Sequence, residues 1–453
     1  MTAEGRLFCP AGSPLAPLVD GLAWLWRLGP RVDAPQARAV GVGEPRDAAE
    51  LAALVAARHL AGAVVFAAGS GEDAGPLPAR RRQAGVARFG ALSVEGPHTV
   101  FANGRAAVRS SLGVHAVRDG GFMALGAGPA TWGRVDVVWA LDAVAHFLAE
   151  RLGRPLVLLP EIGCLRLDDF PGTAELQLRG EARDDARQRR RAERMIAFLR
   201  RAEARLVVAV AARALDGERE VPLDQVWPRA VAALAHGVER GVLEPACHGL
   251  LHLEPAARAE GHVDPREFSR IDAREAGRRL DAATRWLGQT IGAPRSFIAP
   301  AWGYGAGALA AASERGLLTW LPPAPGPLLR EAWLRETLAI GLPGLHGLNY
   351  APLRRLAAVG VPPTIVFHGQ LLDDRLPRLR SGRDVRSAAR LAMLPDLPRL
   401  ARLAGIRWVG AEELAQSLRA HEAIVVEGAE IRSAGEPARL LYGGGASVGS
   451  ARA

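Results

Sequence analysis

The sequence predicts an α/β fold in which a (β/α) barrel follows a smaller α/β domain. Its 453 residues exceed what one compact core accommodates. Hydrophobic residues make up 49% and charged residues 23%, as in globular rather than disordered chains. From residue 155 onward, apolar strand-like runs alternate with helical patterns, and chemically capable residues stand where those runs stop. Active sites gather at such strand ends in (β/α) barrels. The expected divisions are 1–152, 153–420 and a short β-like extension with a flexible tail, 421–453.

The charge composition argues against nucleic-acid binding. The net charge is +9, and all 57 basic residues in the Lys+Arg count are Arg. These arginines are dispersed and interleaved with Asp and Glu, so we expect a composition bias rather than a polyanion-binding surface. The absence of Lys also excludes a P-loop and a Schiff-base mechanism.

Cysteine usage and hydropathy indicate a cytoplasmic protein. The three cysteines form no Cys-x-x-Cys pair and are odd in number, which argues against a disulfide framework. The first thirty residues lack a signal-like pattern, and no apolar stretch reaches spanning length. We therefore expect no membrane partner, while the oligomeric state stays open.

The N-terminal third is expected to be an accessory α/β domain. Residues 37–43, 47–60 and 63–68 predict a strand, an amphipathic helix and a strand, which form one βαβ unit. The Asn-Gly pair within 99–108 predicts a hairpin, and a long helix follows at 135–152. This region contains no nucleophile–base pair and no dinucleotide-binding glycine spacing, so its role is unknown.

The functional interpretation depends on residues 165–172, Leu-Arg-Leu-Asp-Asp-Phe-Pro-Gly. They predict a strand that ends in two adjacent carboxylates. Neighbouring side chains on a regular strand point to opposite faces. Asp168 and Asp169 therefore reach one site only where the pleat breaks, which we place at Pro171-Gly172. Two acids at a strand end favour a cation.

Histidines supply the expected partners of these acids. His248 and His252 are the only two of the 11 histidines that lie four residues apart. Chance gives about 0.27 such pairs in this composition, so the pair alone is a weak signal. The order of features strengthens it: Asp-Asp, His-xxx-His, an aromatic Pro/Gly loop at 296–305, and His368 at the end of a buried strand.

This order resembles the polysaccharide deacetylases, carbohydrate esterase family 4, over residues 155–420. The family's first motif has two aspartates, its second has two metal-binding histidines, and its last strand carries a histidine. By resemblance Asp168 is the catalytic base, His368 the catalytic acid, and Asp169, His248 and His252 the ligands of a divalent metal ion, with zinc expected. The resemblance also implies a distorted (β/α) barrel of the deacetylase type, closed by the strand and helix at 403–414.

Several positions depart from the family pattern. Ile298 stands where the family has an Arg that holds the catalytic Asp, and Arg295 would have to replace it from elsewhere on the loop. Arg166 and Phe170 replace the Thr and Gly of the first motif, and no fourth-motif Asp is evident near Trp320. These departures indicate a divergent branch.

The expected chemistry follows from the residue types. One carboxylate and two neutral imidazoles leave coordination positions open, as in catalytic zinc sites. Bound water then acquires a pKa near ~7. Asp168 would take its proton during attack on an acyl carbonyl, the metal and backbone N–H groups would stabilise the oxyanion, and His368 would protonate the leaving amine. Pro300, Trp302 and Tyr304 are expected to contact a small-molecule or glycan substrate, with Tyr304 equally suited to packing.

Three functions remain open at this stage. The leading hypothesis is a metal-dependent hydrolase that removes an acyl group, expected to be acetyl, from the nitrogen of an amino sugar or related amide. The alternative, motivated by Ile298, is a catalytically impaired barrel that serves as a carbohydrate-binding or regulatory module. Nucleic-acid binding is the weakest. Cys247, beside His248, is expected to be a small buried residue rather than a ligand.

Overall fold

The structure is a computed structural model. It describes residues 5–10, 13, 16–36, 39–43, 52–54, 56–57, 64–67, 80–89, 92–101, 106–110, 113–119, 122–125, 138–152, 154–178, 184–321, 333–335, 351–368, 405–427, 430–432, 438–442 and 448–451.

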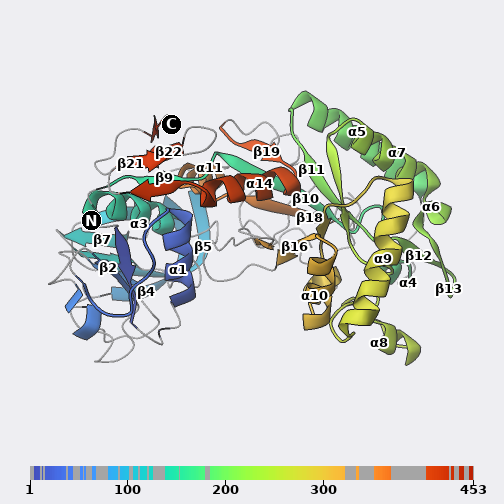
Figure 1. The fold of residues 1–453 in the computed structure, drawn as a ribbon, viewed down its shortest axis with the longest axis horizontal. Helices are drawn as coiled ribbons and strands as arrows, with labels where there is room; N and C mark the ends of the chain where they lie inside the picture. The colour runs from blue at the N-terminus through green and yellow to red at the C-terminus, as the bar shows by residue number, and fades with distance from the viewer. Residues whose placement is uncertain are drawn as a thin grey trace.

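A mixed sheet forms the N-terminal part (Figure 1). Its parallel strands are β1 (Arg6–Phe8), β2 (Ala39–Gly43), β3 (Val64–Ala67) and β8 (Phe122–Leu125). Its antiparallel strands are β7 (Gly113–Asp119), β5 (Leu92–Phe101), β4 (Arg80–Phe89) and β6 (Ala106–Ser110). Helices α1 (Ala16–Leu25) and α3 (Val138–Arg151) belong to the same part. The parallel pairing of β2 with β3, with helical residues between them, confirms the predicted βαβ unit.

The predicted Asn-Gly hairpin is wrong. Strands β5 and β6 flank Asn103 and Gly104, which lie outside the described residues, but each of these strands pairs with β7. Among the described strands the longest hairpin joins β4 to β5 instead, and the sequence analysis did not predict it.

The second sheet is parallel throughout and carries the predicted barrel architecture. Its order is β17 (Trp333–Arg335), β16 (Leu318–Leu321), β15 (Ser296–Phe297), β14 (Leu243–Cys247), β11 (Leu206–Val210), β10 (Ile162–Asp168) and β18 (Thr364–His368), and β19 (Arg407–Val409) pairs with the start of β10. Every residue of β10 and β11 is buried, because strands of a parallel sheet are covered on both faces. Among the described strands β17 and β18 pair with no further strand, so the barrel is open and distorted.

Helices and short elements connect these parallel strands. The helices are α4 (Ala174–Leu178), α5 (Asp185–Arg201), α6 (Leu223–Val226), α7 (Pro228–Glu239), α8 (Pro255–Ala259), α9 (Ala273–Thr290), η3 (Pro300–Trp302), α10 (Ala306–Glu314), α11 (Ala351–Ala358) and α14 (Ala411–Glu422). Strands β12 (Arg213–Asp216) and β13 (Arg219–Pro222) form a hairpin. Figure 1 shows α5, α7 and α9 on the side of the barrel away from the N-terminal sheet.

The C-terminal strands return to the start of the barrel segment. Strand β22 (Ala438–Leu441) pairs antiparallel with β9 (Leu156–Leu158) and with β23 (Val448–Ala451), while β20 (Val425–Glu427) pairs with β21 (Glu430–Arg432). The β-like extension is therefore present. The last strand occupies part of the segment expected to be a flexible tail.

Buried contacts join the N-terminal part to the barrel. The indole N–H of Trp26 donates to the carbonyl oxygen of Val359 at 3.0 Å, and Nε2 of His421 donates to that of Leu25 at 2.9 Å. One buried apolar cluster contains residues of both parts, including Trp26 and Leu165. No helix within the described segments has the length and apolarity needed to span a membrane.

Candidate metal centre

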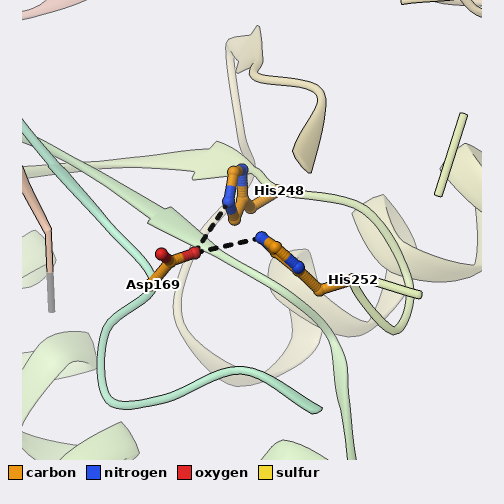
Figure 2. A group of neighbouring side chains, drawn as sticks. All are labelled: Asp169, His248 and His252. Carbon is orange, nitrogen blue, oxygen red and sulfur yellow. Dashed lines mark hydrogen bonds and ion pairs between the residues drawn. The ribbon is translucent and has the colours of Figure 1, made fainter. Parts of the chain in front are cut away.

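Three side chains from distant segments converge at the C-terminal ends of the parallel strands. Asp169 directly follows β10, His248 directly follows β14, and His252 lies in the loop after His248. Oδ1 of Asp169 is 3.0 Å from Nε2 of His248 and 3.2 Å from Nε2 of His252 (Figure 2). All three side chains are buried, and their ligand atoms lie within 4.8 Å of one another. The predicted convergence of these residues is therefore present.

The backbone turns out of the strand at Asp169 itself. This residue has a φ of 63°, in the left-handed region that non-glycine residues rarely adopt. The break therefore lies two residues before the predicted position at Pro171. Because Asp169 has left the strand, its side chain escapes the alternation that would otherwise set it opposite Asp168. His252 also has a φ of 63°. Backbone strain at a cluster of functional side chains is typical of a binding site.

The hydrogen bonds of His248 point to a cation between these side chains. Its Nδ1 lies 2.9 Å from the carbonyl oxygen of Ile298, which only accepts, so Nδ1 carries a proton. A neutral ring then has its lone pair on Nε2, directed at the Asp169 carboxylate. Two lone pairs at this distance repel unless a proton or a metal ion lies between them. A backbone carbonyl that fixes the ring in this way is a common partner of metal-binding histidines.

The same contacts govern the ionisation of Asp169. Burial by itself raises the pKa of this carboxyl. When protons on the two Nε2 atoms stand in the place of a metal ion, the charges and hydrogen bonds of His252 and His248 outweigh burial and hold the pKa of Asp169 well below its ordinary value. Asp169 is therefore a carboxylate and an anionic donor at neutral pH.

Asp168 is held by an arginine that the sequence comparison treated as a departure. Nε of Arg166 donates to Oδ1 of Asp168 at 2.9 Å, and Nη2 donates to Oδ2 at 2.6 Å. Arg166 is fully buried, and its guanidinium lies 5.3 Å from the ring centroid of Trp302 and 5.5 Å from that of Trp320. This bidentate pair does what was expected of an arginine at Ile298, from a different strand. Arg295 is not involved, because its side chain is exposed and its Nε lies 3.6 Å from Glu412.

The backbone of His368 lies beside that of Asp168. The register of the parallel pair β10 and β18 sets His368 opposite Asp168 at the last position of both strands. The side chain of His368 is outside what the structure describes, so its predicted role as the acid stays a prediction.

The loop residues predicted to contact substrate have different surroundings. The ring of Trp302 packs on Arg166, and Pro300 is buried. The hydroxyl of Tyr304 accepts from the backbone N–H of Ala299 at 3.0 Å and donates to the carbonyl oxygen of Trp320. The Tyr304 hydroxyl is thus committed to fixing the loop, and substrate contact by these three residues remains a prediction.

Sequence reasoning missed one residue of the site and read another correctly. Glu267 is fully buried and accepts hydrogen bonds from the backbone of the histidine loop, including that of His252 at 2.8 Å. An acid in an irregular segment whose loop partners are backbone N–H groups leaves no sequence signal. Cys247 is buried as predicted, and burial raises the pKa of its thiol to about 12. It is therefore a neutral packing residue, not a thiolate ligand.

The chain is similar in structure to members of the family that its motifs resemble. A putative polysaccharide deacetylase from Mycobacterium smegmatis is 15% identical with a TM-score of 0.36, over 59% of this chain and 94% of that one. A family 4 carbohydrate esterase from Streptomyces lividans, in complex with acetate, is 11% identical with a TM-score of 0.31, over 56% and 93% of the two chains. A family 4 pseudoenzyme from Bacillus anthracis is 9% identical with a TM-score of 0.32, over 58% and 68%.

No protein-family model and no curated protein matches the sequence. At these TM-scores the likenesses carry no argument about activity, so the function proposed below depends on the geometry of the site.

Proposed function

We propose that this protein is a metal-dependent hydrolase that removes an N-acyl group, in the simplest case acetyl, from an amino sugar or related amide. The observation that carries the proposal is the convergence of the carboxylate of Asp169 with Nε2 of His248 and of His252, next to a second carboxylate, Asp168, that takes no part in the cluster.

The donor set fits a zinc ion. Two ligand atoms that each lie about 2.0–2.1 Å from a tetrahedral ion are roughly 3.3 Å apart. The Nε2 atoms of His248 and His252 lie 3.0 and 3.2 Å from Oδ1 of Asp169. Nitrogen and oxygen donors of this kind suit zinc, and three protein ligands leave positions open as in catalytic sites.

The chain's own residues supply the remaining functions. A divalent ion at this site would polarise a carbonyl and lower the pKa of water. Asp168, fixed by Arg166, accepts the proton that a water molecule loses as the water oxygen attacks the acyl carbon. His368 donates a proton to the nitrogen when the carbon–nitrogen bond breaks, which yields a carboxylic acid and an amine. An amide nitrogen leaves only when it is protonated, so the mechanism needs an acid.

The test measures metal content and acetate release together. Purified protein is loaded with zinc and incubated with a chitin oligosaccharide as the probe, and released acetate is quantified. Asp169→Ala and His248→Ala are expected to lose bound zinc and acetate release. His236→Ala is the matched control, because His236 is an exposed histidine on α7. Unchanged zinc content in both site variants would end the proposal.

A catalytically impaired saccharide-binding barrel is the second candidate. The observation that favours it is the clamp on Asp168, since both oxygens of this carboxylate already accept hydrogen bonds from Arg166. Each oxygen retains a second lone pair, so proton transfer is not blocked. Calorimetry that shows saccharide binding, with no acetate released by the zinc-loaded protein over long incubation, would favour this candidate.

A further inference from the structure

The two histidines of the candidate centre lie in a loop and not on a helix. Residues four apart face the same way on a helix, so a His-xxx-His pair usually needs one. Here the segment from His248 to His252 has no helical turn, and the next helix, α8, begins at Pro255. Some other contact must fix the backbone between the two rings.

That contact is the buried carboxylate of Glu267. The backbone N–H of Leu250 lies 3.1 Å from both of its oxygens, and the N–H groups of Leu251 and His252 lie 3.1 and 2.8 Å from Oε2. Arg279 on α9 donates to Oε1 at 2.9 Å and compensates the charge. Three consecutive N–H groups thus point at one anion that is withdrawn from solvent.

A glycine in the loop makes room for this carboxylate. Gly249 has a φ of 86°, which favours glycine, and a Cβ added there would overlap Oε2 of Glu267 and come within 2.9 Å of the Phe268 ring. The backbone therefore approaches the carboxylate more closely than any other residue type permits. The conformation of the histidine loop therefore depends on glycine at position 249 and on the carboxylate of Glu267.

We propose that Glu267 is a positioning residue of the metal centre, an inference that rests on the proposed function. It is not a ligand, because the group of converging donor atoms contains Asp169, His248 and His252 alone among the described residues. Its charge-assisted hydrogen bonds hold His252 in a strained conformation, with a φ of 63°, that directs the imidazole toward Asp169. Loss of the negative charge releases the loop and separates the two rings.

Glu267→Gln tests this role, because glutamine keeps the shape and removes the charge. Its amide group presents a donor where the carboxylate presents an acceptor, so in either orientation of the amide an NH2 group faces Arg279 or the loop N–H groups, which are donors themselves. We expect zinc affinity, measured by competition with a chromophoric chelator, to fall about 10- to 100-fold. The absorption spectrum of the cobalt-substituted protein is expected to change as well, because the donor geometry changes.

The matched control is Glu254→Gln. Glu254 is also a buried acid and accepts the backbone N–H of Ala257 at the start of α8, two residues beyond His252. We expect this variant to keep the wild-type zinc affinity and cobalt spectrum, even if it lowers the unfolding temperature. Gly249→Ala is a second variant that displaces the carboxylate without altering its charge, and it is expected to weaken zinc binding as well.

Hydrogen exchange separates this inference from the proposed function. In the metal-free protein, Glu267→Gln is expected to speed amide exchange at Leu250, Leu251 and His252, and the control is not. Wild-type protein that binds no zinc would end the proposed function, yet faster exchange at these three amides would still support the role of Glu267 in the loop. Unchanged exchange, or unchanged zinc affinity in a folded Glu267→Gln variant, would overturn the inference.

Discussion

Two adjacent aspartates in this protein have different surroundings, which suit them to different chemistry. Asp168 ends β10 and lies on the same face as Arg166, two residues earlier, which binds both of its oxygens. Asp169 has left the strand, and its Oδ1 contacts the imidazoles of His248 and His252. A charge-compensated, oriented carboxylate suits proton transfer, and a carboxylate between two lone-pair donors suits a metal ion.

The Asp168–Arg166 pair is expected to contribute much more to stability than an exposed pair of the same geometry. Removing one partner of a buried pair leaves an uncompensated charge, so Arg166→Met is expected to lower the free energy of unfolding by about 3–5 kcal/mol. Arg315→Met is the matched control, because Arg315 binds Asp281 through Nε and Nη2 at 2.7 and 2.8 Å near the surface. Its expected loss is about 0–1 kcal/mol. Urea unfolding curves measure the loss of stability in both variants. Equal losses would contradict the larger stabilising contribution of the buried Asp168–Arg166 pair.

Arg166→Lys separates orientation from charge. Lysine keeps the positive charge but cannot make two parallel hydrogen bonds to Asp168. Without these two hydrogen bonds the Asp168 carboxylate is free to shift, and a small displacement of a catalytic group costs on the order of 10²-fold in rate. We expect acetate release from the zinc-loaded variant to fall by about that factor in kcat, with KM and zinc content near the wild-type values. A fall confined to KM would assign Arg166 to substrate binding.

At the residue scale the sequence predicted the three converging side chains, but the roles of Arg166 and Glu267, which hold the neighbouring groups in place, were missed. The convergence of Asp169, His248 and His252 was predictable because candidate metal ligands have distinctive residue types, and these three stand at or just after strand ends. Arg166 was treated as a lost threonine, although residues i and i+2 of a strand share a face, and this rule alone would have paired it with Asp168. Glu267 was not predictable, because its partners in the histidine loop are backbone groups that every residue carries, and its side-chain partner, Arg279, lies on a later helix.

At the scale of elements, apolar parallel strands were predictable and pairing partners were not. The runs at β10, β11 and β18 are short and mostly apolar, so the existence of these strands follows from the sequence, whereas β14 contains Glu244 and Pro245 and has a weaker pattern. Strand β9 looks like the first barrel strand, yet it pairs with β22 from the end of the chain. Hydrophobicity indicates that a strand is buried, but not which of several apolar edges it joins.

Helix α14 docks on the N-terminal part through a histidine whose ionisation affects stability. Burial of His421 against Trp24 lowers its pKa from 6.5 to about 4, despite the hydrogen bond it donates to Leu25. The positive charge of Arg27 acts in the same direction as burial. His421 is therefore neutral in the folded protein at pH values where the unfolded chain already binds a proton.

The free energy of unfolding is expected to depend on pH through His421. Above pH 6.5 the residue is neutral in both states and contributes nothing. As the pH falls from 6.5 to about 4, the unfolded state takes up the proton first, so stability is lost across this window, on the order of 3 kcal/mol in total. His421→Gln keeps a donor for Leu25 and removes the titration. Urea unfolding at several pH values is expected to show a smaller acid loss in this variant than in wild type, whereas parallel curves would exclude His421 as the cause.

At the scale of the whole molecule, the N-terminal part and the barrel share buried contacts. The cluster that contains Trp26 continues to the barrel strands, and the indole N–H of Trp26 donates to the carbonyl oxygen of Val359 at 3.0 Å. The sequence indicated two sheets, because their strand patterns differ. It gave no sign of this continuity, since residues that pack across such a boundary resemble any other core residues.

Shared contacts of this kind predict that zinc bound at the proposed site stabilises both parts, although Asp169, His248 and His252 all belong to the barrel. A ligand that binds only the folded state adds about 2.7 kcal/mol at a hundred times its dissociation constant, and cooperative unfolding spreads this gain over every segment that opens together. Hydrogen exchange with zinc and with a chelator measures the gain at β2 and at β11. We expect slower exchange in both strands with zinc, and Trp26→Phe, which leaves Val359 without its indole donor, is expected to reduce the gain at β2 alone. Protection confined to β11 in the wild-type protein would mean that the two parts unfold independently in spite of their common core.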